Sequence, residues 1–257
     1  MRATLERLLG GEDLSAEEAG AVMQALTDAA LPPAVGGALL AALRTKGETA
    51  EEIRGFAEAM RALAVRVTPA SDGSPLVDTC GTGGDGSGSL NLSTAAALIA
   101  AAAGVRVVKH GNRSISSRAG SADVLETMGI PIDLGPAAAE VCLDATGFVF
   151  LFAPNYHPSM KHVMPIRRAM GVRTVFNMLG PLSNPAAPPF QVVGAFSLSA
   201  AEKMAHALSK MKIERAFVVH GADGWDEATP LGPYHLFDVR SGHVEATVRD
   251  PQDAGIP

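Results

Sequence analysis

The sequence lacks the features that mark secreted and membrane-spanning proteins. It contains only two cysteines, Cys80 and Cys142, so it has no disulfide framework and is typical of a protein in a reducing cytosol. No apolar run reaches about 18 residues, which argues against a membrane-spanning helix. The first residues, MRATLERLLGGED, do not contain the apolar region of a secretory signal. We therefore expect a cytoplasmic protein with no membrane partner.

The sequence also lacks an excess of positive charge. Its net charge of −6 at pH 7 argues against a general nucleic-acid-binding protein. The composition, 47% hydrophobic and 19% charged, is that of a globular protein. A chain of 257 residues is long enough for one substantial core, or for one core and a smaller satellite domain.

The first 67 residues have the pattern of helices alone. Ser15 with Glu18, and Thr49 with Glu52, form the capping-box pattern that begins a helix. A proline pair at 32–33 separates two apolar-periodic stretches. We predict an all-helical domain over residues 1–67, followed by a linker with the sequence TPASDGSP at 68–75.

Beyond the linker, short apolar strands alternate with helices, which predicts a larger α/β domain over residues 74–257. Near-continuous apolar strands indicate a mostly parallel sheet covered on both faces. The segment 155–190 is irregular, rich in proline and basic residues, and we expect part of it to join the helical domain. The predicted strands are 75–79, 105–110, 147–153, 191–197 and 215–221, and the predicted helices are 91–103, 121–128, 136–145 and 199–212.

A glycine-rich stretch, DTCGTGGDGSGSLNLST at residues 78–94, lies between the first predicted strand and a predicted helix. Backbone N–H groups in such a stretch are free to point at one ligand, and the helix N-terminus adds partial positive charge. These features indicate an anion-binding site, with an ordinary loop as the alternative. Asp85 within the stretch suits a ligand that also carries hydroxyl groups or a metal ion.

The stretch matches the dinucleotide-binding pattern G-x-G-x-x-G through Gly81, Gly83 and Gly86, but its surroundings do not fit that ligand. The helix should begin at the third glycine, whereas SGSLN intervenes. An acidic residue is expected roughly 20 positions later, where this sequence has Arg106 and Lys109. A P-loop is also a poor match, because no lysine follows the glycines.

A second polar segment, KHGNRSISSRAGSAD, follows the predicted strand VRVV. Ligands of a doubly wound sheet bind beyond the carboxyl ends of its strands. The cations of this segment, with its hydroxyl and amide side chains, suit pyrophosphate or a phosphorylated ribose. A solvated basic loop is the alternative.

Two further features point to a metal and to a carboxylate ligand. Asp226 and Glu227 follow the predicted strand RAFVVHG, and adjacent carboxylates near a phosphate site indicate Mg²⁺. Taken alone, such a pair is more often a solvent-facing one. The basic segment 157–173 contains Arg167, and an arginine there is able to bind a carboxylate through two parallel hydrogen bonds.

Several motifs occur together in the order found in one enzyme family. DTCGTGGDG, NLST, KHGNRSISS, GSADVLETMG, RTVFNMLGPLSNP and HGADGWDE resemble the anthranilate phosphoribosyltransferases, and the resemblance extends from the N-terminal helices to about residue 230. It implies a small helical domain beside a mostly parallel α/β domain of the nucleoside phosphorylase type. It also implies a homodimer, Mg²⁺, and transfer of phosphoribose from phosphoribosyl pyrophosphate to anthranilate in tryptophan biosynthesis.

The resemblance assigns roles to individual residues. Ser93, Asp226 and Glu227 would place Mg²⁺, and Lys109, Asp85 and Arg167 are the catalytic candidates. Ser89 stands where the family usually has threonine, which keeps the hydroxyl group. The anthranilate site would comprise Gly81, His110, Asn112, His157 and Arg167. The phosphoribosyl pyrophosphate site would comprise Gly81, Gly84, Asp85, Ser89, Asn91, Leu92, Ser93, Thr94, Lys109, His110, Gly111, Asn112, Arg113, Ser114, Ile115, Ser116, Ser117 and Ser121.

The C-terminal part departs from the family pattern. Family members usually continue for several more helices and strands, whereas this sequence stops at DPQDAGIP. The stretch ATPLGPYHLFDV after the acidic pair also fits the pattern poorly. We therefore expect an α/β domain that is truncated at its C-terminus, with one side left uncovered.

Three rival functions remain open at this point. A pyrimidine nucleoside phosphorylase shares the implied fold, although KHGNRS and GPLSNP favour the anthranilate branch. A non-catalytic relative that binds nucleic acid through the basic cleft is disfavoured by the net charge of −6 and by the retained acidic pair. A truncated remnant that only dimerises through its helices is the third.

Overall fold

The computed structural model describes residues 1–69, 74–114 and 119–256. Its N-terminal part is a bundle of α1 (Arg2–Leu9), α2 (Ala16–Thr27), α3 (Pro33–Lys46) and α4 (Ala50–Ala62). Both predicted capping boxes are confirmed: the Ser15 side chain accepts from the N–H of Glu18, and Thr49 accepts from the N–H of Glu52.

The bundle is tied together by a buried carboxylate. Glu52, fully shielded from solvent, accepts hydrogen bonds from the N–H of Leu14 at 2.9 Å and the N–H of Thr49 at 2.8 Å. The Lys46 ammonium, at the end of α3, donates to the same carboxylate at 3.0 Å. Because the buried charge has a cationic partner and several donors, it connects α3 and α4 to the loop that precedes α2 without leaving the carboxylate unpaired.

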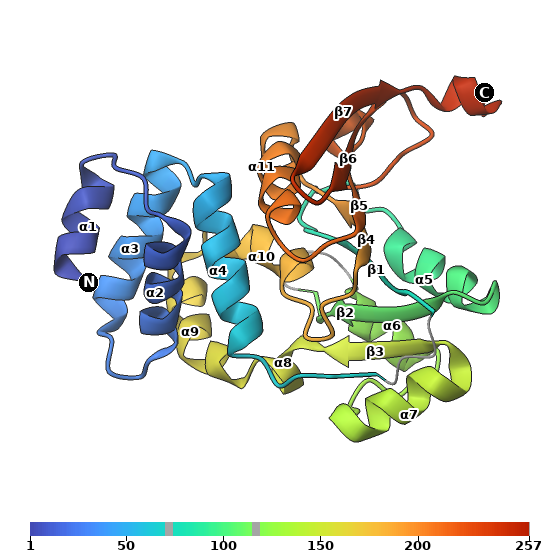
Figure 1. Cartoon of the computed structure of the whole chain (residues 1–257), viewed down its shortest axis with the longest axis horizontal. Coiled ribbons are helices and arrows are strands. Elements are labelled where there is room, and N and C mark those ends of the chain that lie inside the picture. The colour runs from blue at the N-terminus through green and yellow to red at the C-terminus, as the bar shows by residue number, and fades with distance from the viewer. Residues whose placement is uncertain (70–73, 115–118, 257) are drawn as a thin grey trace.

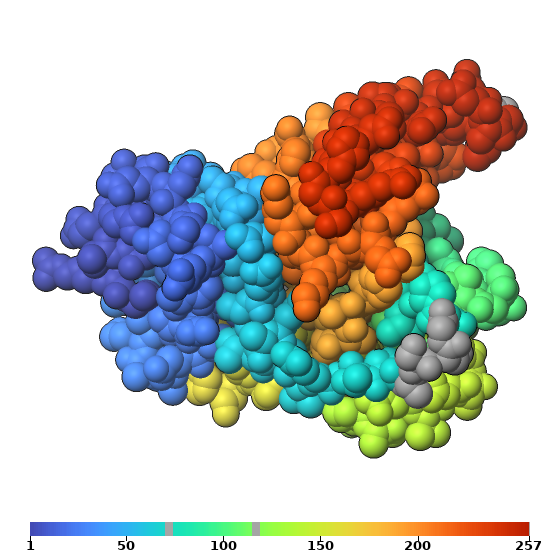
Figure 2. Space-filling view, viewed as in Figure 1, coloured from blue at the N-terminus to red at the C-terminus, as the bar shows by residue number. Residues whose placement is uncertain are grey.

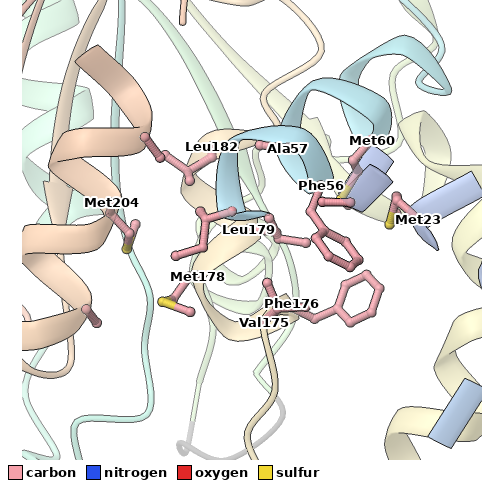
Figure 3. Packing of buried hydrophobic residues seen from close by; sticks show 14 of the residues in the cluster. Met23, Phe56, Ala57, Met60, Val175, Phe176, Met178, Leu179, Leu182 and Met204 are labelled. Atoms are coloured by element: carbon pink, nitrogen blue, oxygen red, sulfur yellow. The ribbon is translucent and has the colours of Figure 1, made fainter. Parts of the chain in front are cut away.

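Helices α2 and α4 approach each other closely because glycine stands at their crossing. A Cβ atom at Gly55 of α4 would lie 2.1 Å from the carbonyl oxygen of Ala16 in α2. Below this crossing, Phe56 and Met60 pack against residues that come much later in the chain, among them Leu179 (Figure 3). The bundle therefore shares one continuous core with the second half of the molecule.

The second part of the chain is built on a seven-stranded sheet, with the strand order β3-β2-β1-β4-β5-β6-β7. β3, β2, β1, β4 and β5 pair in parallel, and β6 and β7 are antiparallel additions at one edge. The order reverses at β1, so the crevice at the carboxyl end of β1 is the expected ligand position. The strands are β1 (Leu76–Gly81), β2 (Arg106–Gly111), β3 (Phe148–Phe152), β4 (Phe190–Gly194), β5 (Arg215–His220), β6 (Tyr234–Arg240) and β7 (His243–Arg249).

The helices predicted between the strands are present and lie on both faces of the sheet (Figure 1). α11 packs against β5, β6 and β7 on one face and also contacts α4, so the bundle contacts the α/β part of the chain through α11. Figure 2 shows these two parts side by side. On the opposite face of β5–β7, a groove is lined by residues that include Phe217, Leu236 and Thr247. These helices are α5 (Leu92–Ala102), α6 (Ser121–Thr127), α7 (Pro136–Thr146) and α11 (Leu198–Ser209).

The irregular segment 155–190 contains short helices that the sequence did not predict. α9 packs against α3, the 3₁₀ helix η1 against α2, and α10 against α4, so the segment lies on the helical bundle. Prolines break the apolar period here, and Pro181 even lies inside α10. The elements are α8 (Ala153–Tyr156), η1 (Pro158–His162), α9 (Val163–Met170) and α10 (Phe176–Leu182), while η2 (Ala222–Gly224) and η3 (Pro251–Ala254) follow later. Among the described residues, no helix has the length and apolar character needed to cross a bilayer.

The close crossing of α2 and α4 at Gly55 is tested by the stability of the chain to denaturation. We expect Gly55→Ala to lower the free energy of unfolding by about 2 kcal/mol, because the added methyl group overpacks the backbone of Ala16. Gly37→Ala in α3 is the matched control: its Cβ would meet only Ile166 at an ordinary 3.9 Å, so the helix should gain up to about 1 kcal/mol. Urea denaturation of both variants measures the difference, and equal stabilities would contradict the close crossing.

Candidate active site

Polar segments from the ends of β1, β2 and β5 converge at the carboxyl edge of the sheet. The glycine loop after β1 lies against the segment after β5, where the N–H of Gly83 donates to Asp226 Oδ2 at 2.7 Å. The backbone N–H of Asp226 in turn points to Asp85 Oδ2 at 3.4 Å. The sequence thus correctly placed these two segments beside each other.

The glycine loop holds a series of left-handed backbone conformations. Gly83, Gly84, Gly86 and Gly88 have φ values of 65°, 73°, 77° and 66°, which residues with a side chain rarely adopt. Within the residues that the structure describes, the backbone N–H groups of Gly84, Asp85, Gly86 and Gly88 donate to no acceptor. Successive unpaired N–H groups in such a loop form a concave site for an anion.

The start of this loop, at Thr82, is anchored to the end of β4 and to the residues that follow it. The N–H of Thr82 donates to Gly194 O at 2.9 Å, and the N–H of Phe196 donates to the Thr82 hydroxyl at 3.0 Å. Gly194 itself has to be glycine, because a Cβ there would lie 1.5 Å from the carbonyl oxygen of Asp226. Because the end of β4 lies against Asp226 and also binds Thr82, it holds the first residues of the glycine loop in one position.

The Lys109 ammonium lies beneath the start of α5 and is enclosed. It is 1% exposed, and its Nζ donates to Thr79 O at 2.5 Å and to Ser93 Oγ at 3.2 Å. Burial lowers the pKa of Lys109, and the nearby Asp78 carboxylate opposes that shift. The Lys109 ammonium therefore places a positive charge between the end of β1 and the start of α5. It lies next to the Ser93 hydroxyl, which we predict to contact a metal ion.

Three carboxylates, those of Asp85, Asp226 and Glu227, lie together beside the glycine loop, and the charge of Lys109 acts on Glu227. Burial raises the pKa of Asp226, a hydrogen bond from Gly83 opposes the shift, and the charge of Asp85 adds to it. Burial and the neighbouring Asp226 raise the pKa of Glu227 to about 7, against the lowering effect of Lys109. Crowded, partly desolvated carboxylates of this kind suit a cation placed between them.

The donor set fits Mg²⁺ only in combination with a substrate. Across the described residues, no group of three or more His, Cys, Asp or Glu side chains has the arrangement of a complete metal site. Mg²⁺ usually binds one or two carboxylates together with water and substrate phosphates. Asp226 and Glu227, with the Ser93 hydroxyl close to Lys109, meet that description.

Two buried histidines lie between the sheet and the segment 155–190. The rings of His110 and His157 meet edge to face, with centroids 5.1 Å apart and an interplanar angle of 61°. Burial lowers the pKa of His110 to about 3 and that of His157 to about 4, so both rings are neutral. In the described part of the chain, His110 Nε2 and both ring nitrogens of His157 have no hydrogen-bond partner. Such nitrogens are available to a polar ligand or to water.

Arg167 on α9 is a largely buried cation without a carboxylate. Its guanidinium lies 5.0 Å from the centroid of the Phe176 ring and points to the sulfur of Met164 at 3.8 Å. Burial lowers the pKa of Arg167. No ion pair forms between Arg167 and any acid of the described residues. An unpaired cation in such a position calls for an anionic ligand.

Other predicted residues occupy different surroundings. The Arg113 guanidinium is already paired with Asp123 at 2.9 Å and Glu126 at 2.8 Å, so its charge is largely neutralised. Asn112 is exposed, and its carbonyl oxygen accepts from the Ser121 hydroxyl at 3.2 Å. Ser89, in the glycine loop, and Leu92, the first residue of α5, are exposed, whereas Thr94 is buried. Gly111 is the last residue of β2, and Ser114 follows it in the next loop. The Asn91 side chain donates to Ala119 O at 3.3 Å, and the predicted Ile115, Ser116 and Ser117 lie outside the described residues.

Sequence reasoning missed a buried polar network below the site. The Asp78 carboxylate accepts from Asn184 Nδ2 at 2.8 Å and faces the N–H of His110 at 3.4 Å. Burial raises the pKa of Asp78 to about 6, against the charge of Lys109. Asn184 also donates to Val108 O at 2.8 Å and so fixes the turn after α10 to β2. The available signal was a polar residue in each of two motifs, Asp78 in DTCGTGGDG and Asn184 in GPLSNP. Their contact depends on the tertiary fold, so the sequence alone did not reveal it.

Comparison with known proteins gives matches over nearly the whole chain. A model described as "Glycosyl transferase family, helical bundle domain" matches residues 2–64, and one described as "Glycosyl transferase family, a/b domain" matches residues 73–257. An anthranilate phosphoribosyltransferase from Desulforudis audaxviator is 51% identical over 256 residues, which are 100% of this chain and 73% of the relative.

Solved structures show the same similarity in three dimensions. An anthranilate phosphoribosyltransferase from Thermus thermophilus has a TM-score of 0.89 and 45% identity, covering 98% of this chain and 74% of that chain. The enzyme from Saccharomyces cerevisiae, in complex with PRPP and Mg, has a TM-score of 0.86 and 27% identity, covering 97% and 72%. A second structure of the yeast enzyme, in complex with 4-fluoroanthranilate, has a TM-score of 0.84 and 26% identity, covering 98% and 73%.

Proposed function

Because this chain belongs to the anthranilate phosphoribosyltransferase family, we propose that the residues at the carboxyl edge of its sheet bind phosphoribosyl pyrophosphate next to anthranilate. The chain transfers the 5-phosphoribosyl group of 5-phosphoribosyl 1-pyrophosphate to the amine of anthranilate, with Mg²⁺. The products are N-(5-phosphoribosyl)anthranilate and pyrophosphate, in a step of tryptophan biosynthesis. The single observation that supports the site best is the glycine loop with its unpaired N–H groups beside the carboxylates.

The donor substrate would occupy the glycine loop. Its diphosphate would accept hydrogen bonds from the backbone N–H groups of Gly84, Asp85, Gly86 and Gly88, and the N-terminus of α5 adds partial positive charge. The buried Lys109 ammonium contributes its charge from below. The segment 111–117 and Ser121 would complete the contacts to the ribose and its 5-phosphate.

Magnesium would be held by Asp226, Glu227 and Ser93. When bound, the ion supplies positive charge that neutralises the diphosphate. The carboxylates also carry raised pKa values because of their burial and mutual charge, and a divalent cation would relieve that repulsion.

The acceptor would lie between the helical bundle and the sheet. Arg167 provides the cation for the anthranilate carboxylate, and Asn112 and the backbone of Gly81 would complete the pocket. His110 and His157 are neutral, so they line the path of an aromatic ligand without adding charge. The yeast relative carries 4-fluoroanthranilate in its complex, which supports an aromatic acid as the acceptor.

The reaction forms a bond from the anthranilate nitrogen to C1 of the ribose and breaks the bond from C1 to pyrophosphate. An aromatic amine is neutral at pH 7, so it needs no general base to act as the nucleophile, and the proton that its nitrogen carries after the bond forms is lost to the departing pyrophosphate or to water. The difficult part is the positive charge on the ribose and the negative charge on the leaving group. The N–H groups of the loop and Lys109 stabilise the leaving group, Arg167 and Asn112 orient the acceptor, and the Asp85 carboxylate favours the cationic ring.

We also propose that the chain is a cytoplasmic homodimer, as its resemblance to the family implies. Two of the three rival functions fit the site less well. A nucleoside phosphorylase has no need of a cation for an acceptor carboxylate, and Arg167 is such a cation. A nucleic-acid-binding relative has no need of the clustered Asp85, Asp226 and Glu227, whose charges oppose a polyanionic backbone.

The role of Arg167 is tested by kinetics. We expect Arg167→Ala to raise the KM for anthranilate at least about tenfold, because it removes a charge-assisted pair, with a smaller change in the KM for phosphoribosyl pyrophosphate. Loss of anthranilate fluorescence with phosphoribosyl pyrophosphate and Mg²⁺ measures the rate. Arg168→Ala, on the exposed side of α9, is the control. A larger effect on the donor than on the acceptor would remove Arg167 from the acceptor site.

The metal site is tested by titration. We expect Asp226→Asn combined with Glu227→Gln to shift the Mg²⁺ dependence of the rate by about tenfold or more to higher concentration, because both carboxylate ligands are lost. Calorimetric titration of the variant with magnesium pyrophosphate gives a readout independent of turnover. Asp223→Asn is the matched control, since this exposed acid has φ 57°, a conformation that asparagine tolerates. An unchanged titration of the double variant would contradict the metal assignment.

A further inference from the structure

Arg173 connects the helical bundle to the glycine loop. It lies between α9 and α10, and its backbone oxygen accepts from Arg44 Nη1 of α3 at 2.5 Å. Its guanidinium stacks on the Phe196 ring, 4.4 Å from the centroid, and donates to the carbonyl oxygen of Gly84. One residue thus contacts the bundle through its backbone and the phosphate loop through its side chain.

The carbonyl that Arg173 holds fixes the direction of the next N–H group. No peptide bond of the described chain is cis, and in a trans peptide the C=O and the N–H point in opposite directions. While Arg173 holds the Gly84 oxygen, the Asp85 N–H therefore points away from the guanidinium. That N–H is one of those without an acceptor among the described residues.

The loop does not fix this peptide by itself. Gly84 has φ 73° and no side chain, so rotation of the 84–85 peptide meets little steric resistance. After rotation, the negative end of the carbonyl dipole would face the bound anion and one N–H donor would be lost. Holding the carbonyl from outside removes that alternative and leaves the site ordered before the ligand arrives.

Phe196 restricts the movement of the Arg173 guanidinium. Its N–H donates to the hydroxyl of Thr82 at 3.0 Å, so the ring under the guanidinium is attached to the same loop that Arg173 contacts. Planar stacking and a directed N–H are both properties of arginine that lysine does not reproduce.

We propose that Arg173 is a positioning residue for the diphosphate: it holds the Gly84 carbonyl outward so that the Asp85 N–H faces the anion, with Phe196 as its platform. The inference rests on the function proposed above. It predicts that Arg173 acts through the backbone of the loop and does not itself bind the substrate.

The test uses calorimetric binding of magnesium pyrophosphate, together with separate KM and kcat values for both substrates. We expect Arg173→Met to weaken pyrophosphate binding and to raise the KM for phosphoribosyl pyrophosphate by about tenfold, as for loss of one charge-assisted hydrogen bond. The KM for anthranilate should stay within about twofold. Arg173→Lys should lose nearly as much, and Phe196→Leu should lose several-fold because the platform is gone. Arg215→Met is the matched control, since Arg215 also stacks on a phenylalanine, Phe217 at 4.7 Å, away from the site.

Each outcome decides between distinct explanations. Full pyrophosphate affinity in Arg173→Met would overturn the inference. Retained affinity in both Arg173→Lys and Phe196→Leu would also overturn it, because it would show a direct charge contact between residue 173 and the diphosphate. Failure of the unsubstituted chain to bind magnesium pyrophosphate would instead contradict the proposed function. A fall in thermal stability without a change in affinity would assign Arg173 to structure alone.

Discussion

The contact between Asp226 and the glycine loop is the constraint on which the site depends. The Asp226 carboxylate accepts the Gly83 N–H, while its backbone oxygen lies where a side chain at Gly194 would be. These approaches are possible only because β1 and β4 end in glycine. They bring an acidic segment from the end of β5 against an anion-binding loop from the end of β1. An acid and an anion site so close together are compatible only when a cation lies between them.

The helical bundle contributes to this site through a shared core. Phe56 and Met60 of α4 pack with Phe176 and Leu179 of α10 (Figure 3). The segment 155–190, which contains α10, also carries Arg167 and Arg173. The backbone that carries the two arginines is therefore positioned by apolar packing against the bundle, while the Arg173 guanidinium also contacts Phe196 and Gly84 on the sheet side. The site lies where two parts of the chain meet, which explains why a donor and an acceptor of different chemistry are able to bind next to each other.

Much of the fold and part of the site could be predicted from the sequence. The five parallel strands were predicted within about three residues because buried strands give continuous apolar runs. The hairpin β6–β7 was missed, since β7 is a largely exposed strand with few apolar residues. The placement of Asp226 and the glycine loop at the same edge of the sheet followed from strand topology. The Gly83 hydrogen bond to Asp226, the Arg113 ion pairs and the Arg173 contact to Gly84 depend on tertiary packing that no local pattern encodes.

The central claim is that the unpaired N–H groups of the glycine loop bind the diphosphate. Amide ¹⁵N and ¹H chemical shifts of the labelled chain, followed during addition of magnesium pyrophosphate, test it most directly. We expect the largest shifts at the amides of Gly84, Asp85, Gly86 and Gly88. Saturable binding that leaves these amides unshifted, with the changes elsewhere on the surface, would contradict it.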